Sequence, residues 1–134
     1  MILWDERFRV GVGRIDDQHK ELFAFTNGLE EDIQAGWQTG KANETVQFLV
    51  EYAKLHFRHE EDCMLKYQCP VAQINKDAHA QFLSAVEGFQ RKLAFSPGKE
   101  LITDIHEFLQ SWLIQHICKI DVKLRPQAAS PLKD

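Results

Sequence analysis

A histidine and a glutamate four residues apart, His56 and Glu60, are the residues of this chain best suited to chemistry. In a helix, this spacing places both side chains on one face, one turn apart. That face continues at steps of three and four residues, the spacing of a buried helix face, through Val46, Leu49, Ala53 and Cys63. Because a lone ionised carboxylate is costly to bury, the pattern predicts that a partner or a metal ion lies opposite.

Composition indicates an ordinary globular domain. The chain has 134 residues, of which 44% are hydrophobic and 27% charged, so a single core of useful size is expected. The net charge is −4 and lysine and arginine do not cluster, so neither nucleic acid nor a membrane is an expected partner. We predict one domain over residues 1–126, including an extended N-terminal arm over 1–14, and a flexible tail over 127–134.

The cysteines and the first residues bear on the compartment. Three cysteines without a CxxC pattern favour reduced thiols, which are typical of the cytoplasm. Asp5 and Glu6 stand where a secretory leader needs apolar residues, so we expect no such leader. The sequence contains no run of 18 apolar residues, so we expect no membrane-spanning helix.

Hydrophobic periodicity predicts four helices and no strand. The first begins near Asp16 or Asp17, either of which is a candidate N-cap, and ends near Gly36. For the fourth helix, Ser96 is the candidate cap, with Pro97 in the first turn. The remaining helices are expected over 42–66, 71–94 and 98–119. Four helices with short connections predict an all-α, antiparallel up-down-up-down four-helix bundle.

Each of the other expected helices also carries a ligand-type residue on its buried face. His19 lies on the first helix, Asn75 and His79 lie on the third, and His116 lies on the fourth, with Asp121 shortly after it. Imidazole suits Fe, Zn, Cu and Ni, and carboxylates can bridge two ions. Four histidines and two carboxylates exceed what one tetrahedral zinc ion needs. The pattern therefore predicts a metal site in the bundle core, whose donors would all be used by two ions that share carboxylates.

These motifs, taken together, resemble those of the hemerythrin family, and in particular its single-domain bacterial members. The resemblance covers residues 4–121. The matching pieces are Trp4, the run Ile15-Asp16-Asp17-Gln18-His19-Lys20-Glu21-Leu22, His56-Phe57-x-x-Glu60-Glu61, His79-x-x-Phe82, and Trp112-Leu113-x-x-His116-Ile117-x-x-x-Asp121.

The resemblance implies a centre of two non-haem irons, joined by an oxo or hydroxo group, that binds dioxygen reversibly. One iron, which keeps a position for oxygen, would be held by His19 and His56, and the other by His79 and His116. Both carboxylates would bridge the irons, namely Glu60 and Asp121. The implied task is carriage, storage or delivery of dioxygen or another small diatomic, with an oxygen-using enzyme as partner, rather than catalysis.

The chain departs from the family at one ligand position. The family pattern on the third helix is His-x-x-x-His, and here it is Asn75-x-x-x-His79. An amide oxygen is a weaker donor to iron than imidazole. Three roles stay open: Asn75 binds through its oxygen, holds a water on the second iron, or leaves that iron weakly bound. A buried asparagine that only fixes helix register is a further alternative.

The same departure keeps other functions open. A modified di-iron site suits a redox enzyme or sensor, such as an oxidase, a peroxidase or a nitric-oxide-handling protein. A bundle with one structural metal is a further alternative. Of the remaining residues, Glu30, Glu61 and His106 are expected in solvent, and His59 at the surface or between helices.

Overall fold

The computed structural model describes residues 1–36, 39–96 and 98–124, and the side chains of 39–42 are not among those described. The predicted tail over 127–134 and Pro97 lie outside these residues. The described chain forms four α helices and two short 3-10 helices, with no strand. They are η1 (Glu6–Phe8), α1 (Gly13–Gln34), α2 (Thr39–Lys66), α3 (Ala72–Phe95), α4 (Lys99–Lys119) and η2 (Asp121–Lys123).

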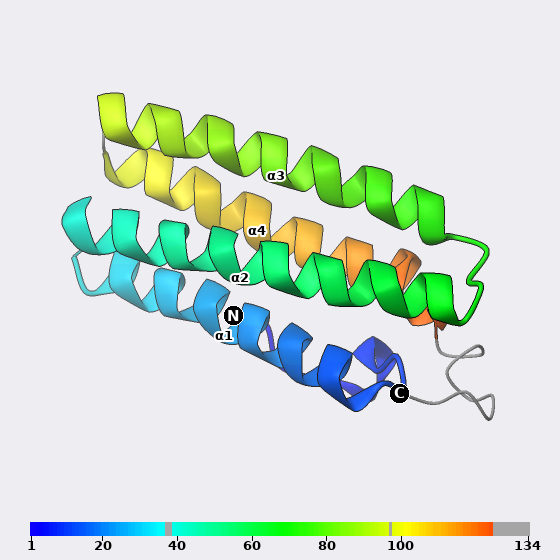
Figure 1. Ribbon diagram of the computed structural model, residues 1–134. Helices are drawn as coiled ribbons and strands as arrows, with labels where there is room; N and C mark the ends of the chain where they lie inside the picture. The colour runs from blue at the N-terminus through cyan, green and yellow to red at the C-terminus, as the bar shows by residue number, and fades with distance from the viewer. Residues whose placement is uncertain (37–38, 97, 125–134) are drawn as a thin grey trace.

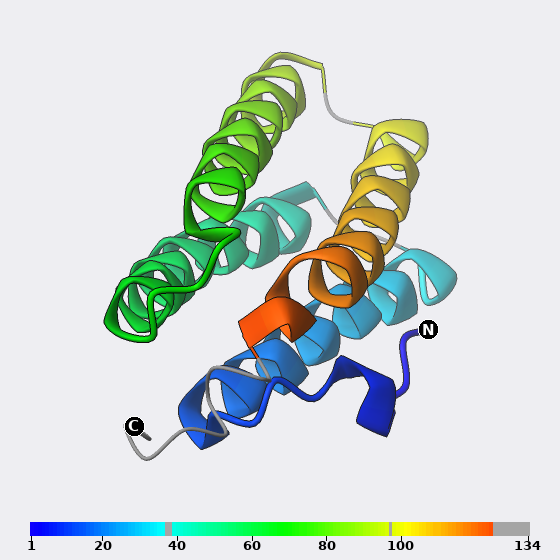
Figure 2. The same ribbon diagram turned by 90° about the vertical axis from the view of Figure 1, so that its right-hand side faces the viewer.

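The four helices lie side by side and alternate in direction (Figure 1). Each helix packs against the next, and α4 packs back against α1, so the four close into a ring (Figure 2). Short connections at alternate ends force this antiparallel order, and the predicted four-helix bundle is confirmed. None of the described helices is long and apolar enough to cross a membrane.

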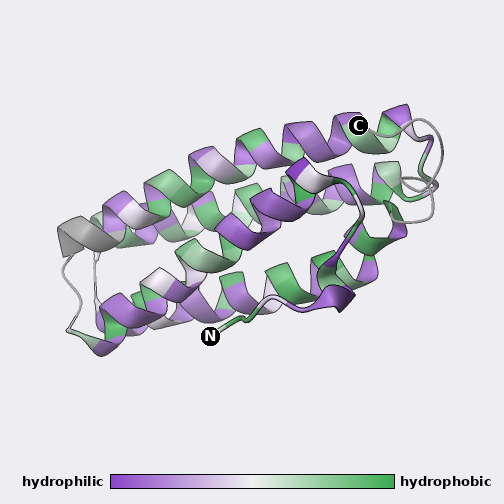
Figure 3. Ribbon diagram, turned by 90° about the horizontal axis from the view of Figure 1, so that it is seen from below, coloured by the Kyte–Doolittle hydropathy of each residue, from purple (hydrophilic) through white to green (hydrophobic). Residues whose placement is uncertain are grey.

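The apolar residues of each helix gather on one face. Green and purple segments alternate along the ribbons because hydrophobic residues recur about once per turn (Figure 3). The core between the helices buries fully, among others, Leu22, Leu29, Phe82, Val86 and Leu109. The faces predicted from periodicity are therefore the faces that the bundle buries.

The N-terminal arm packs along the outside of the bundle, where η1 contacts α4 (Figure 2). Its Phe8 is 1% exposed and meets Phe23 of α1 edge to face, with ring centroids 5.2 Å apart. The prediction that Asp16 or Asp17 caps the first helix is wrong. The helix begins three residues earlier, and the Asp16 carboxylate instead accepts hydrogen bonds from the Val10 N–H (2.8 Å) and the Gly11 N–H (3.2 Å).

The cap predicted for the fourth helix is also wrong. Ser96 closes α3, where its backbone N–H donates to the Lys92 carbonyl over 2.8 Å. Gly98 takes the N-cap position of α4 with an extended backbone and makes no side-chain cap. At the end of α1, Gly36 adopts a φ of 87°, the left-handed conformation with which helices commonly end.

The role of Asp16 can be tested with its neighbour as control. Asp16→Ala removes the acceptor of two arm N–H groups, so unfolding free energy should fall by about 1–3 kcal/mol. Hydrogen exchange at Val10 and Gly11 should accelerate at the same time. Asp17 is exposed, so Asp17→Ala should change neither quantity. Equal effects of the two substitutions would contradict this role.

Candidate metal centre

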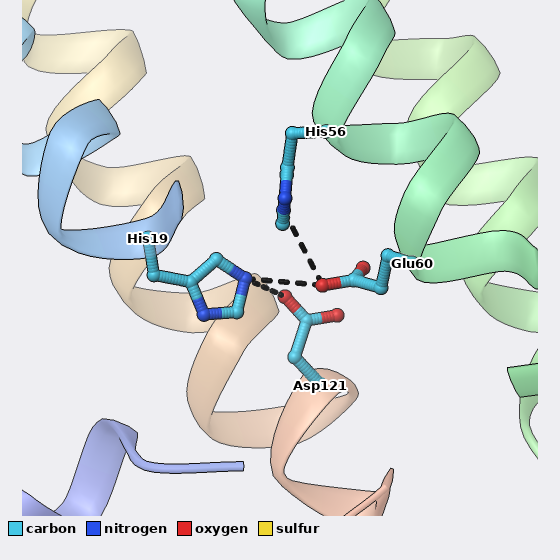
Figure 4. Close-up of side chains that lie close together, drawn as sticks. All are labelled: His19, His56, Glu60 and Asp121. Carbon is cyan, nitrogen blue, oxygen red and sulfur yellow. Dashed lines mark hydrogen bonds and ion pairs between the residues drawn. The ribbon is translucent and has the colours of Figure 1, made fainter. Parts of the chain in front are cut away.

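Six predicted ligands converge in the bundle core from all four α helices and from η2. All six are at most 5% exposed: His19, His56, Glu60, His79, His116 and Asp121. Figure 4 shows four of them, with the side chains of His19 and His56 directed toward the carboxylates of Glu60 and Asp121. Buried groups of this kind must be paired or bound to a cation, because desolvation of an isolated charge is very costly.

The carboxylate of Glu60 stands between two pairs of imidazoles. Its Oε2 lies 3.0 Å from His19 Nε2 and 3.3 Å from His56 Nε2. Its Oε1 lies 3.0 Å from His79 Nε2 and 3.9 Å from His116 Nε2. One oxygen therefore faces each pair.

Asp121 repeats this arrangement. Its Oδ2 lies 3.2 Å from His19 Nε2, and its Oδ1 lies 3.1 Å from His116 Nε2. The described residues thus contain two overlapping groups, in each of which the ligand atoms lie within 4.8 Å of one another. The groups are His19, His56, Glu60, Asp121 and Glu60, His79, His116, Asp121. The two groups share both carboxylates.

Asp121 reaches the core because the helix changes at its end. The last α-helical bond joins the Ile120 N–H to the His116 carbonyl, and the chain then tightens into η2. A 3-10 turn has three residues per turn instead of 3.6, which rotates the next side chains relative to the helix. Asp121 is 1% exposed as a result, although it lies outside the register of the buried face of α4.

Three side chains outside the ligand set fix the outer nitrogens of two histidines. His56 Nδ1–H donates to Gln18 Oε1 over 2.8 Å, and Gln18 Nε2–H donates to His59 Nδ1 over 2.7 Å. His79 Nδ1–H donates to Glu61 Oε2 over 2.8 Å. These bonds leave each Nε2 free to bind a metal, which is the usual role of such partners.

Sequence reasoning missed two of these partners. Gln18 belongs to one of the matching motifs, but that motif does not indicate its role. Its place directly before the ligand His19 is the one signal in the sequence that could have identified it. Glu61 was expected in solvent, which is wrong: its side chain is 27% exposed and binds His79. The geometry of α2 explains this contact. Glu61 directly follows Glu60 and is rotated by about 100° around the helix axis, so its side chain points toward the neighbouring α3 rather than into the core.

Two aromatic rings hold the histidines of the second pair. Phe57 stacks on His79 with ring centroids 3.8 Å apart and 7° between the planes. Trp112 stacks on His116 with centroids 4.2 Å apart and 12° between the planes. Since Phe57 and Trp112 also contact each other, they fix the orientation of both imidazoles.

The centre is strongly polarised. Burial alone would lower the pKa of His19, but the close carboxylates of Asp121 and Glu60 outweigh it and raise that pKa to about 10. In the same way, the charge of Asp121 raises the pKa of His116 to about 9 against the effect of burial. Burial would raise the pKa of Glu60, yet the surrounding imidazoles, beginning with His56, hold it well below its usual value. Without metal, protons therefore supply the positive charge that the carboxylates require.

The contacts fit cations better than they fit protons. The Nε2 atoms of His79 and His116 lie only 3.1 Å apart, where at most one proton can be shared. Neither oxygen of Asp121 accepts a well-aligned hydrogen bond from any described residue, despite the two close imidazoles. Imidazole nitrogens and carboxylate oxygens that face a common point are donors for Fe, Zn, Cu or Ni ions. The donor set thus suits the two ions predicted from the sequence.

The other candidate residues lie apart from this cluster or at its edge. Asn75 is completely buried on α3, and neither amide atom has a hydrogen-bond partner among the described residues. His106 and Glu30, expected in solvent, are also misplaced by the prediction. His106 is 9% exposed, and Glu30 binds the N-terminal ammonium over 2.9 Å, because the arm folds back over this side of the bundle.

The fold and the centre together define a helical bundle with a buried metal-binding cluster of histidines and carboxylates. Comparison with known proteins agrees. The family profile described as "Hemerythrin HHE cation binding domain" matches residues 10–128. This chain belongs to the hemerythrin family.

Individual relatives cover most of the chain. The bacteriohemerythrin of Clostridium acetobutylicum is 27% identical over 124 residues, which are 90% of this chain and 96% of that protein. The bacteriohemerythrin of Methylococcus capsulatus is 30% identical over 115 residues, 85% of this chain and 86% of that protein. A crystal structure of wild-type hemerythrin superposes with a TM-score of 0.85 at 25% identity, covering 97% of this chain and 99% of that one.

The hydrogen bonds of Gln18 to His56 and His59 give a direct test of how these partners support metal binding. Gln18→Leu removes the acceptor that fixes His56 Nδ1–H, so affinity for metal should fall about 10- to 100-fold. Isothermal titration calorimetry of the metal-free protein with Zn²⁺ measures this loss of affinity. Gln73 is exposed, and its side chain donates to Asp77 rather than to a histidine of the centre, so Gln73→Leu is a matched control that should bind Zn²⁺ normally. Unchanged affinity in Gln18→Leu would show that the bridge does not support the site.

Metal uptake should depend on pH with a defined sign. The pKa values of about 10 for His19 and about 9 for His116 mean that both are protonated in the metal-free protein at neutral pH. Each ion must displace a proton, so apparent Zn²⁺ affinity should rise about tenfold per pH unit from about pH 6.5 to 8.5, with about one proton released per ion. His106→Gln should release as many protons as the wild type. Affinity that is independent of pH would contradict these protonation states.

Proposed function

We propose that this protein is a non-haem di-iron protein that binds dioxygen reversibly, for carriage, storage or delivery. One observation carries the proposal: Glu60 and Asp121 each direct one oxygen to each pair of imidazoles. Carboxylates placed in this way bridge two ions, and four histidines then supply two nitrogen donors to each. Membership of the hemerythrin family supports the same reading.

The donor set favours iron with room for a small ligand. Two histidines with carboxylate oxygens and open positions are typical of non-haem Fe(II) sites that use oxygen. On the side of the first pair, an ion would be held by four residues, namely His19, His56, Glu60 and Asp121. Two ferrous ions would supply the two electrons that reversible binding of dioxygen requires.

The chain contributes geometry and a dry environment. Three of the four histidines have apolar neighbours on their buried faces that are at most 3% exposed: Ile15 and Leu22 beside His19, Ala53 before His56, and Leu113 and Ile117 beside His116. These residues exclude water, which strengthens the electrostatic contacts of the centre and limits side reactions. The fixed nitrogens of His56 and His79 hold the donors in place before a ligand arrives.

The thiols support a reducing compartment, and we propose the cytoplasm. Cys69 lies in a buried apolar cluster and is a free thiol. Cys118 is free as well and half-buried. Thiols that remain unpaired in this way are typical of reducing compartments.

The proposal is tested by iron content and optical spectra. Protein loaded anaerobically with Fe²⁺ should contain two irons per chain. Exposure to oxygen should produce a charge-transfer band that disappears when the sample is degassed. Oxygen consumption with an added reductant would indicate a redox enzyme instead, and a single metal per chain in the wild type and in Asn75→His alike would indicate a structural site.

Two histidine variants provide the matched comparison. His56→Gln removes a donor and should abolish the oxygen-dependent band and lower the iron content. His106→Gln replaces a buried histidine that lies near Glu30 instead of the centre, so its iron content and band should equal those of the wild type. Equal spectra in the two variants would contradict the proposed centre.

A further inference from the structure

Asn75 is a buried polar group without a partner. It is 0% exposed, and neither Oδ1 nor Nδ2 has a hydrogen-bond partner among the described residues. An amide buried without compensation costs about 1–3 kcal/mol by protein mutational data. Such groups are rare in native proteins, and each one requires an explanation, of which a bound water or ion is one.

The position of Asn75 indicates what that partner is. Asn75 precedes His79 by four residues in α3, so the two side chains lie one above the other on the same buried face. His79 Nε2 faces Glu60 Oε1 and His116 Nε2 in the second half of the centre. Helix geometry thus directs the amide of Asn75 to the same half.

We infer that Asn75 Oδ1 is a weak ligand of the ion on the His79 and His116 side. This inference rests on the proposed di-iron function. A cation there satisfies the buried amide oxygen. A neutral amide is a poorer donor to iron than imidazole. The two metal positions are therefore unequal, and the ion beside Asn75 is held less tightly and exchanges first.

Two hollows of the surface lie beside the half of the centre to which Asn75 belongs. A hollow of about 200 Å³ is lined by His116, Trp112 and Ala78, and one of about 340 Å³ is lined by His79, Phe57 and Lys76, among others. Both hollows reach histidines of the weaker half.

The test follows iron loss from each half. Protein loaded anaerobically with Fe²⁺ is mixed with excess of a ferrous chelator, and released iron is recorded with time. The wild type should lose its two irons in a fast and a slow phase of equal size. Asn75→His should slow the fast phase about tenfold or more, because imidazole is the stronger donor. Asn75→Leu should accelerate it or leave one iron per chain.

The other half supplies the control. Gln18 supports His56, so Gln18→Leu should accelerate the slow phase and leave the fast phase unchanged. Asn75→Leu should also raise the Tm of the metal-free protein, because it removes an unpartnered buried amide. A lower Tm for that metal-free variant would show that Asn75 serves helix register instead, and would overturn the inference.

The outcomes separate this inference from the proposed function. Two irons that leave at one rate, unchanged by Asn75→His, would overturn the role of Asn75 and leave the di-iron proposal standing. One iron in the wild type and two in Asn75→His would support the inference. At most one iron in both proteins would contradict the di-iron proposal and the inference together.

Discussion

The structure depends on two carboxylates buried among four imidazoles. Glu60 and Asp121 are at most 1% exposed, and together they contact all four histidines of the centre. Among the described residues, no lysine or arginine is buried in this cluster, so the negative charge must be balanced by imidazolium protons or by cations. Desolvation makes that requirement strict, because an unbalanced charge in the core would cost several kcal/mol. The polar centre thus ties the stability of the bundle to what it binds.

The bundle meets this requirement with supports on each side of the centre. Gln18 and Glu61 hold the outer nitrogens of two histidines, while Phe57 and Trp112 stack on the rings of the second pair. The donors are therefore oriented before an ion arrives, which reduces the entropy that binding must overcome. In the centre that we propose, Asn75 would be a donor of lower strength, and this one position would make the two halves of the centre different.

Much of this could be predicted from sequence. Helical periodicity determined the four helices and the buried faces, because a one-turn repeat of apolar residues has few alternatives at this length. The same periodicity brought out His19, Glu60 and His79 as polar residues on apolar faces. Contacts between helices are harder to predict from sequence. Glu61 and His106 lie on the sides of their helices that face a neighbouring element, and their burial depends on how that element packs. The hydrogen bonds of Asp16 could not be predicted, because its partners belong to the N-terminal arm, and the arm shows no hydrophobic periodicity from which its path could be inferred.

The most direct measurement of the central claim is thermal unfolding before and after exhaustive removal of metal. If the core is polar because it holds ions, metal at about 1,000 times its Kd adds about 4 kcal/mol to the free energy of unfolding. The Tm should then fall by about 10 °C or more on chelation, and recover fully when Fe²⁺ is restored without air. An identical Tm in the metal-free and iron-loaded protein would contradict the account.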